Sequence, residues 1–309
     1  MDSNDPSLSI IVVNKDDVRV ADTLERLVEI EGESGAELIV VDASSRRLDD
    51  IRASYPTVEW LDYVHPSGKP RTIAEQRNVG LRQAKGDVIV FLDANCVPSE
   101  HWLRELLAPI EDDTEDIVVG AVTSRNSPTI HDHERRPGVD DKGYLSECST
   151  MNLAVRRQVF DAVGTFDERL GFAEDVDFSW RAVDASFRLR YAPDAVVAHD
   201  WDSSQANFAR AFRYGVARVR LYRKHRSRLR RLLGPDIDVA GYTMFLAFLP
   251  IALVFPAYLL LLAVPLVRNR RNQPVAAVTY HLCYAAGVLS ELLHIPVLKG
   301  QRRRFSPRD

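Results

Sequence analysis

The chain has 309 residues, 46% of them hydrophobic and 27% charged, a composition that fits one large or two modest globular units and excludes a disordered or collagen-like polymer. Its three cysteines, Cys96, Cys148 and Cys283, are too few and too scattered for a disulfide framework or a CxxC metal site, which favours a reducing compartment. The net charge of −4 combines −18 over residues 1–202 with +14 over residues 203–309. The two parts are therefore expected to face different surroundings.

Residues 7 to about 122 alternate short β-branched runs with helical patterns, as expected for an open α/β sheet. The polar N-terminus lacks the basic start and the apolar stretch of a secretory signal, so this part is expected in the cytosol. A polar stretch without periodicity, Ser124–Glu147 with His131 and His133, predicts a mobile loop. The predicted strands are Leu8–Val13, Glu37–Val41 and Val88–Leu92, and the predicted crossover helices are Asp17–Ile30 and Thr72–Ala84.

A strongly basic segment follows. Residues 203–235 contain no Asp or Glu, and ten Arg or Lys lie between Arg210 and Arg231. Apolar residues recur there at spacings of three and four, which predicts an amphipathic helix with a basic face. A solvated or nucleic-acid-binding helix would show the same charges, but the neighbouring apolar runs favour anionic lipid, with no nucleic acid partner. The recurring residues are Phe208, Phe212, Val216, Val219 and Tyr222.

Two apolar runs follow the basic segment. Tyr242–Val267 has 26 residues without a charge, and a helix of that length would reach about 39 Å, enough to cross a hydrocarbon core of about 30 Å. Because Pro250, Pro256 and Pro265 interrupt this predicted transmembrane helix, a re-entrant or tilted segment is the alternative. Val275–Leu298 is a weaker second candidate, since it carries His281, Glu291, His294 and Pro296.

The charges that flank the two runs predict their orientation. Basic residues before the first run and after the second, from Lys299 to Arg308, suggest a hairpin with both ends in the cytosol. Arg268, Arg270 and Arg271 lie in the connecting loop of that hairpin and oppose the model. A shallow hairpin that does not span the membrane is therefore the alternative to a spanning one.

Polar residues follow the three predicted strands, and the carboxyl ends of strands are where open α/β sheets bind ligands. No GxGxxG follows the first strand and no GxxxxGK[ST] occurs, which argues against a dinucleotide oxidoreductase and a P-loop enzyme. Asp93 and Asn95, two apart, can share a cation that bridges a diphosphate, although an isolated DxN is usually a turn or cap. The strand ends are Asn14-Lys15-Asp16, Asp42-Ala43-Ser44-Ser45 and Asp93-Ala94-Asn95.

Four motifs in order, covering roughly residues 7–202, resemble those of the family 2 glycosyltransferases. The resemblance implies a GT-A fold, an α/β Rossmann-like open mixed sheet, in residues 1–202. The basic amphipathic helix, 203–235, and a C-terminal membrane region with one or two transmembrane helices, 236–309, would follow it. The motifs are Val40-Val41-Asp42-Ala43-Ser44, Arg77-Asn78-Val79-Gly80, Asp93-Ala94-Asn95 after its buried strand, and the ED motif within Gly171–Arg181.

The resemblance also implies roles for residues. Asp175, beside Glu174, would be the general base that deprotonates an acceptor hydroxyl, and the product would have inverted configuration. Arg181 would meet the donor or only pair with Asp177, His199 would join the metal site or only be structural, and Asp42 would contact the nucleobase or cap a helix near Arg46. The implied donor-binding residues are Asn14, Asp42, Arg77, Asn78, Asp93 and Arg181, and the implied ligands of Mg2+ or Mn2+ are Asp93, Asn95 and His199.

The sequence thus predicts a metal-dependent inverting glycosyltransferase at the cell membrane, with its catalytic domain facing the cytoplasm. It would transfer a sugar from a nucleotide-sugar donor to a hydroxyl of a lipid-linked or cell-envelope glycan acceptor, and bind membrane lipid through its basic helix. The alternative is a catalytically silent nucleotide-sugar-binding subunit that anchors or regulates a partner enzyme. Asn95, where the family usually has a second acid, supports that alternative, and the intact ED motif opposes it.

Overall fold

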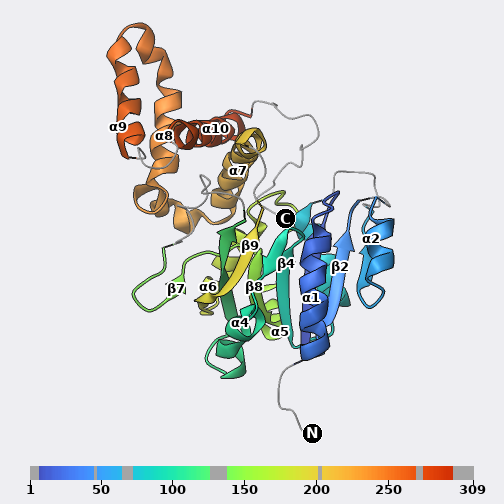
Figure 1. Ribbon diagram of the computed structural model, residues 1–309. Coiled ribbons are helices and arrows are strands. Elements are labelled where there is room, and N and C mark those ends of the chain that lie inside the picture. The colour runs from blue at the N-terminus through green and yellow to red at the C-terminus, as the bar shows by residue number, and fades with distance from the viewer. Residues whose placement is uncertain are drawn as a thin grey trace. The chain divides into compact units, whose positions relative to one another are not determined.

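The computed structural model describes residues 7–44, 47–64, 72–125, 138–200, 204–268 and 274–294. Contacts divide the chain into two compact units: Met1–Glu168 with Glu174–Trp201, and Arg169–Ala173 with Asp202–Asp309 (Figure 1). The five residues before the ED motif thus group with the C-terminal unit. The division into segments 1–202, 203–235 and 236–309 stays a prediction about domain organisation.

The first unit is an open mixed α/β sheet, as predicted. Its strands follow the order β3-β2-β1-β4-β8-β6-β9-β5, with β7 also paired to β9. Strands β3, β2, β1 and β4 are parallel, β8 is antiparallel to both β4 and β6, β6 is parallel to β9, and β5 and β7 are antiparallel to β9. The strands are β1 Leu8–Asn14, β2 Glu37–Asp42, β3 Glu59–Asp62, β4 Val88–Asp93, β5 Cys96–Pro98, β6 Ile117–Ser124, β7 Tyr144–Leu145, β8 Asn152–Arg156 and β9 Leu189–His199. The helices are α1 Val20–Ser34, α2 Asp49–Ser54, α3 Ile73–Gln83, α4 Trp102–Glu111, α5 Arg157–Val163 and α6 Glu174–Asp184.

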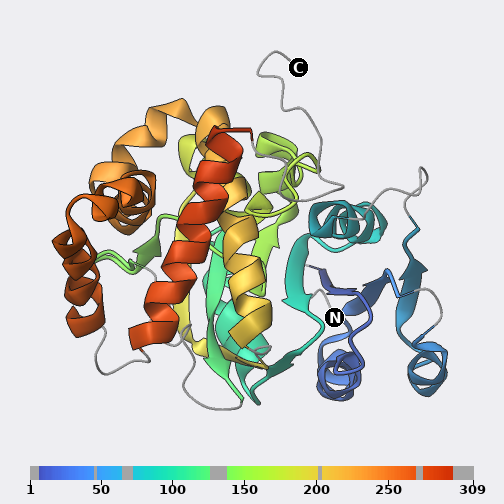
Figure 2. The ribbon, with the colours of Figure 1, turned by 90° about the horizontal axis from the view of Figure 1, so that it is seen from above.

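Helices cover both faces of this sheet, which explains why its central strands are apolar throughout. Ile10 and Val12 of β1 belong to the core formed with α1 and α4, while Ile11 and Val13 belong to the core formed with α3, α5 and α6. Figure 2 shows α1 and α2 on one side of the first strands and α3 on the other. The predicted central strands are confirmed to within one residue, because continuous apolar runs bounded by polar residues have few other solutions.

The register of the parallel strands brings their polar ends together. Asn14 pairs with Asp42 across β1 and β2, and Val13 pairs with Asp93 across β1 and β4. The carboxyl ends of β1, β2 and β4 therefore lie along one edge of the sheet, where the sequence predicts a ligand.

The C-terminal unit is helical. Its long helices α7 and α10 pack against each other, and α8 also contacts α10. Val216, Val219 and Tyr222 of α7 are buried, whereas the sequence pattern had placed this apolar face on a membrane surface. The face is occupied by protein because α10 offers a matching apolar surface. The elements are α7 Ser204–Lys224, η2 Arg226–Leu233, α8 Ile237–Ala247, η3 Leu249–Leu253, η4 Pro256–Leu262, α9 Ala263–Arg268 and α10 Pro274–Leu292.

The first apolar run is not the single transmembrane helix predicted from its length. It is divided among α8, η3, η4 and α9, with a turn at Val254 and Phe255. Pro250 and Pro256 stand at or next to the start of η3 and η4, because proline cannot donate the hydrogen bond that continues a helix. Among the described residues, one helix, α10, is long and apolar enough to cross a membrane by length and composition alone.

The crossing of α7 and α10 depends on two glycines. A Cβ atom at Gly287 would lie 2.0 Å from the Phe212 carbonyl oxygen, and one at Gly215 would lie 1.9 Å from the Tyr284 carbonyl oxygen. Both neighbours are backbone atoms, so the helices would have to separate. We expect Gly287→Ala to lower the free energy of unfolding of the C-terminal unit by about 1–3 kcal/mol, measured by urea titration in detergent.

Gly241 in α8 is the matched control for this substitution. No atom lies within 4 Å of the position that its Cβ would take. Gly241→Ala should therefore leave stability unchanged or raise it by up to about 1 kcal/mol, as expected for alanine in a helix. Equal effects of the two substitutions would contradict the close crossing.

Candidate active site

The ends of β1 and β2 form a buried polar cluster. The Asn14 side-chain amide donates to Asp42 Oδ1 at 3.4 Å and to Ser44 Oγ at 3.3 Å. Asp42 also accepts from the Ser44 backbone N–H at 2.9 Å and from the Ser44 hydroxyl. Asn14 Oδ1 is buried and has no hydrogen-bond partner among the described residues. The cluster thus keeps one acceptor that a ligand can satisfy.

Asp42 does not cap a helix. Helix α2 begins at Asp49 with Leu48 in the capping position, and Ser45 and Arg46 lie outside the described residues. The second Asp42 oxygen, Oδ2, accepts from Arg52 Nη2 at 3.0 Å, and Arg52 also pairs with Asp62. Asp42 is only 2% exposed, so its carboxylate organises the strand ends from beneath their surface.

Helix α3 ties these strand ends together through a residue that the sequence analysis missed. The side-chain amide of Gln76 donates to the carbonyl oxygens of Asn14, at 2.9 Å, and Val41, at 3.3 Å. The helix can lie this close because Gly80 has no side chain: a Cβ there would stand 2.5 Å from Ile11 Cγ2. The glycine of the RNxG motif is therefore needed for packing, and the one available signal for Gln76 was its place directly before that motif.

Arg77 joins the two acidic motifs. Its guanidinium donates to Glu174 Oε1 at 2.5 Å and to Asp93 Oδ1 at 3.1 Å, and the side chain is only 3% exposed. Its helix starts with a capping box, in which the Thr72 hydroxyl accepts from Glu75 N and the Glu75 carboxylate accepts from Thr72 N. A rigid helix thus holds a buried cation between the end of β4 and the start of α6.

Two carboxyl groups at the start of α6 have raised pKa values. Burial, followed by repulsion from Asp175, raises the pKa of Glu174 to about 7, although Arg77 opposes the shift. Burial also raises the pKa of Asp175, against Arg77, with further contributions from Glu147 and Asp93. A carboxylate with a raised pKa is a stronger base than an ordinary one.

The raised pKa of Glu174 predicts how stability depends on pH. Because the folded state holds this proton up to about pH 7 and the unfolded state releases it near pH 4.5, stability should fall as pH rises through that window. We expect Glu174→Gln, which cannot titrate, to remove on the order of 1–3 kcal/mol of this fall between pH 5 and pH 8. Urea titrations of both proteins across that range measure it, and identical pH profiles would contradict the assignment.

Asn78 and Arg181 are engaged with protein. The Asn78 side chain exchanges hydrogen bonds with the Phe166 backbone, at 2.9 and 3.1 Å, and donates to Glu168 at 3.0 Å. Arg181 Nε donates to Asp177 at 2.9 Å, and its other nitrogens donate to the carbonyl oxygens of residues 163–165. The geometry favours the ion-pair interpretation of Arg181, and donor binding by these two residues stays a prediction.

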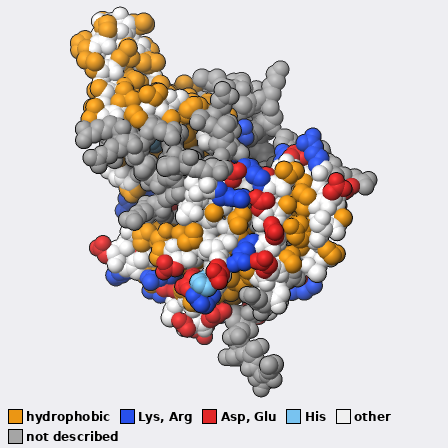
Figure 3. Space-filling view, viewed as in Figure 1, with side chains coloured by type: hydrophobic (Ala, Val, Ile, Leu, Met, Phe, Trp, Pro, Cys, Tyr) orange, Lys and Arg blue, Asp and Glu red, His pale blue; other side chains and the backbone are white. Residues whose placement is uncertain are grey.

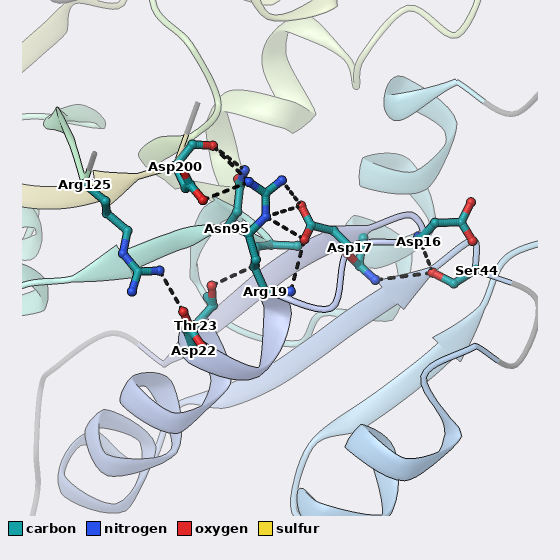
Figure 4. A network of polar contacts seen from close by, with 11 residues as sticks. Asp16, Asp17, Arg19, Asp22, Thr23, Ser44, Asn95, Arg125 and Asp200 are labelled. Carbon is teal, nitrogen blue, oxygen red and sulfur yellow. Dashed lines mark hydrogen bonds and ion pairs between the residues drawn. The ribbon is translucent and has the colours of Figure 1, made fainter. Parts of the chain in front are cut away.

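The three predicted metal ligands come from neighbouring strand ends. Asp93 ends β4, Asn95 precedes β5, and His199 pairs with Cys96 across β5 and β9. Asn95 donates its amide N–H to the Asp200 carbonyl oxygen at 3.0 Å (Figure 4). The pairing of β5 with β9 thus brings His199 and Asp200 next to the DxN segment.

These side chains suit a divalent ion that shares its coordination with a diphosphate. One carboxylate, one amide and one imidazole are acceptable ligands for Mn2+, and Mg2+ is commonly held by one or two carboxylates plus substrate phosphates. No group of three or more His, Cys, Asp or Glu side chains within the described ranges could hold a metal unaided. The set therefore fits a metal that arrives with the donor better than an all-protein cage.

A second network borders the metal ligands and was not found from the sequence. Arg19 donates to Asp17 through Nε at 2.8 Å and to Asp200 Oδ2 through Nη1 at 3.1 Å. Figure 4 shows this chain of contacts running from Asp200 and Asn95 through Arg19 to Asp17. The position of Asp200 directly after His199 was the available signal. Of the predicted loop at 124–147, residues 126–137 lie outside the described part, whereas Tyr144 and Leu145 form the short strand β7, which pairs with β9.

The family of the chain follows from comparison with known proteins. The family model described as "Glycosyl transferase family 2" matches residues 7–167, just over half of the chain. The chain belongs to glycosyl transferase family 2. The members of this family are glycosyltransferases, which transfer sugars from nucleotide-sugar donors.

Two curated relatives agree with this assignment. The chain is 30% identical over 207 residues to the pre-mycofactocin glycosyltransferase of Mycobacterium tuberculosis, covering 62% of this chain and 43% of the relative. It is 30% identical over 162 residues to the glycosyltransferase AglE of Haloferax volcanii, covering 50% of this chain and 53% of the relative. The chain thus spans about half the length of these relatives, and the acceptor of this chain is not assigned from theirs.

A solved structure confirms the fold. A mannosyltransferase from Pyrobaculum calidifontis, in complex with GDP-Man and Mn2+, matches with a TM-score of 0.70 at 18% identity, covering 95% of this chain and 89% of the other. At that identity the match shows the GT-A fold alone.

Proposed function

We propose that this glycosyltransferase inverts the configuration of the sugar that it transfers and uses Asp175 as its general base. The observation that carries the proposal is the buried Arg77, which joins Asp93 of the DxN motif to Glu174 of the ED motif. It brings the donor end of the sheet to the first turn of α6. Asp175 stands in that turn with a raised pKa.

The chemistry needs one proton transfer and one displacement. Asp175 takes the proton of the acceptor hydroxyl while the acceptor oxygen bonds to the anomeric carbon of the sugar. The bond from that carbon to the diphosphate oxygen breaks on the opposite side, and the nucleoside diphosphate leaves with the bonding electrons. Because attack and departure occur on opposite faces, configuration inverts. Arg77 and Glu174 hold the base at the strand end.

The donor is proposed to bind along the ends of β1, β2 and β4. Asn14 offers an unpartnered buried acceptor there, and Asp42 orients it. Asn78 and Arg181, also predicted from the sequence, would act by holding residues 163–168. The complex of the Pyrobaculum enzyme with GDP-Man supports a nucleotide-sugar in such a fold.

Asp93, Asn95 and His199 are proposed to hold Mg2+ or Mn2+ together with the donor diphosphate. When bound, the cation would neutralise negative charge that develops on the leaving group. The Mn2+ in the Pyrobaculum complex supports a divalent ion.

The acceptor is proposed to be a hydroxyl of a lipid-linked or cell-envelope glycan, met at the cytoplasmic side of the cell membrane. The uncharged run of residues 239–267 and the basic residues of the C-terminal unit support this location. An enzyme anchored to the membrane would meet such an acceptor without the acceptor leaving the membrane.

A donor screen tests the proposal. Full-length protein in detergent or lipid is incubated with UDP-, GDP- and dTDP-sugars and Mg2+ or Mn2+, and free nucleotide is measured with and without membrane lipid extract. We expect metal-dependent release from one donor, accelerated by the extract. Anomeric analysis of the product then tests inversion. Binding of a donor without release under any of these conditions would indicate the silent subunit and contradict the proposal.

A further inference from the structure

The C-terminal unit contains a hairpin whose outer part is exposed among the described residues, although its α8 and α9 contact α10. We call residues 239–267 the apolar hairpin; its first arm is α8 with η3, its second arm η4 with α9, and its tip is residues 248–256. No charged residue occurs in it. Figure 3 shows many hydrophobic side chains, with white atoms between them, over the visible face of this projection. Its exposed large apolar side chains are Met244, Phe248, Leu249, Ile251, Leu253, Val254, Phe255, Leu259, Leu260, Leu261, Val264 and Val267.

Exposed apolar side chains lie on several sides of the outer part of the hairpin. Leu259, Leu260 and Leu261 are consecutive in one helical arm and all exposed, so they point to different sides of it. At the tip, Leu253 and Val254 are 88% and 90% exposed. A second protein would cover one side of such a projection, whereas a helix that is apolar all round belongs in lipid.

The backbone N–H donors at the turn of the tip are satisfied within the hairpin. Both Val254 N and Phe255 N donate to the Ile251 carbonyl oxygen, at 3.0 and 2.8 Å, and Pro250 and Pro256 have no N–H to satisfy. Tyr258 carries the one side-chain oxygen or nitrogen between Met244 and Val267, and its hydroxyl donates to the Phe245 carbonyl oxygen at 2.9 Å. Hydrocarbon accepts backbone only when its donors are satisfied in this way.

The arms are too short to carry the tip through a bilayer. Taken as helices, residues 239–254 reach about 27 Å and residues 256–267 about 22 Å, against a hydrocarbon core of about 30 Å. A hairpin that crossed would also place Leu253, Val254 and Phe255 in water on the far side. Because the tip is apolar, it is more stable inside the hydrocarbon core than in water beyond it.

Basic residues lie at the base of the hairpin. Arg226 and Arg230 of η2, directly before α8, are exposed beside the exposed Leu229 and Leu233, a pattern typical of a segment at the headgroup level of an anionic membrane. The second arm ends at Arg268. The turn of the hairpin falls at Val254 and Phe255, so in a re-entrant arrangement both ends of the hairpin and their basic residues stay on the same side of the membrane.

Helix α10 does not supply an alternative span. It packs against α7, and its Glu291 pairs with Arg220 and Arg223 of that helix at 3.2 and 3.1 Å. A spanning α10 would draw these arginines of α7 into the hydrocarbon with it, at a high cost in free energy.

We propose that the apolar hairpin inserts as a re-entrant anchor into one face of a lipid bilayer with anionic headgroups, without crossing it. The proposed anchor concerns binding of the protein to lipid, and its tests do not require the activity proposed above.

A fluorescence experiment on the full-length protein tests the insertion. Val254→Cys is labelled with NBD in a Cys283→Ala background, in which the remaining Cys96 and Cys148 are buried. Val64→Cys, at a position 67% exposed in the first unit, is the control. With vesicles of phosphatidylcholine and phosphatidylglycerol, we expect the label at residue 254 to shift to the blue and to be quenched by lipids brominated on their acyl chains. The label at residue 64 should do neither.

Three results would overturn the proposal. One is a label at residue 254 that vesicles leave unchanged. Another is a label at residue 254 that emits as it does in water and is reduced only by dithionite trapped inside the vesicles, because the tip would then have crossed the bilayer. The third is a variant Leu253→Asp that binds vesicles as well as the parent but loses a dimer in sedimentation, because the hairpin would then contact a second copy.

The same variant provides the quantitative test. Leu253→Asp should weaken vesicle binding on the order of 100-fold, because an aspartate is costly in the hydrocarbon. Val64→Asp adds the same charge at a position outside the hairpin and should leave binding unchanged. Replacing phosphatidylglycerol by phosphatidylcholine should weaken the binding of the parent protein to vesicles. Equal binding to the two kinds of vesicle would contradict a role for Arg226 and Arg230 in binding anionic headgroups.

Discussion

Asp175→Asn is expected to reduce sugar transfer by about 10²–10⁴-fold while leaving donor binding nearly unchanged. Asparagine keeps the size of the side chain and its hydrogen bond from Val176 N, made at 2.8 Å, but cannot accept a proton at neutral pH. Because burial raises the pKa of Asp175, parent activity should also fall as pH drops through that raised value. Nucleotide release at saturating donor and acceptor, with calorimetric donor binding alongside, separates the chemical step from affinity.

Asp161→Asn is the matched control for this prediction. Asp161 lies exposed on α5, so the same loss of one carboxylate charge should leave transfer and stability unchanged. Thermal unfolding of both variants excludes a folding defect as the cause. Full transfer by Asp175→Asn would remove the general base from the mechanism, and loss of donor binding would give Asp175 a role in binding instead.

Arg77→Met is expected to lower the free energy of unfolding by about 3–5 kcal/mol and to abolish turnover. Methionine fills much of the space, but it leaves the buried Glu174 and the half-buried Asp93 without the cation that they share. Chemical denaturation of the full-length protein measures the loss. Arg82→Met on the same helix removes an exposed arginine and should change stability by less than about 0.5 kcal/mol.

A double variant isolates the charge from the packing. Adding Glu174→Gln to Arg77→Met removes the stranded carboxylate, so part of the lost stability should return. If the double variant is less stable than either single one, the cost of Arg77→Met lies in packing and the ion pair contributes little.

Local patterns in the sequence determined much of the first unit. The runs Leu8–Val13, Glu37–Val41 and Val88–Leu92 predicted the central strands because an apolar segment of that length bounded by polar residues is buried on both faces of a sheet. Thr72 and Glu75 marked the start of α3 through a capping box that involves only neighbours in sequence. The order of the strands then placed Asn14, Asp42 and Asp93 along one edge.

Contacts between distant segments could not be determined in this way. Arg77 and Glu174 are 97 residues apart, and the ion pair between them depends on how α3 and α6 pack on the same face of the sheet. The network of Asp17, Arg19 and Asp200 likewise depends on the pairing of β5 with β9. Neither the ion pair nor the network produces a periodic pattern in the sequence, because a side chain that pairs with a distant residue needs no particular residues beside it in the sequence.

The C-terminal unit shows the same division. Its composition determined that it is basic and apolar, but two faces that the sequence assigned to a membrane have different environments in the fold. The apolar face of α7 is covered by α10, whereas the large apolar side chains at the tip of the hairpin, such as Leu253 and Val254, stay exposed. Hydrophobicity establishes that a surface avoids water, and only tertiary structure decides whether protein covers it, because burial is non-directional and either cover removes the same apolar area from water.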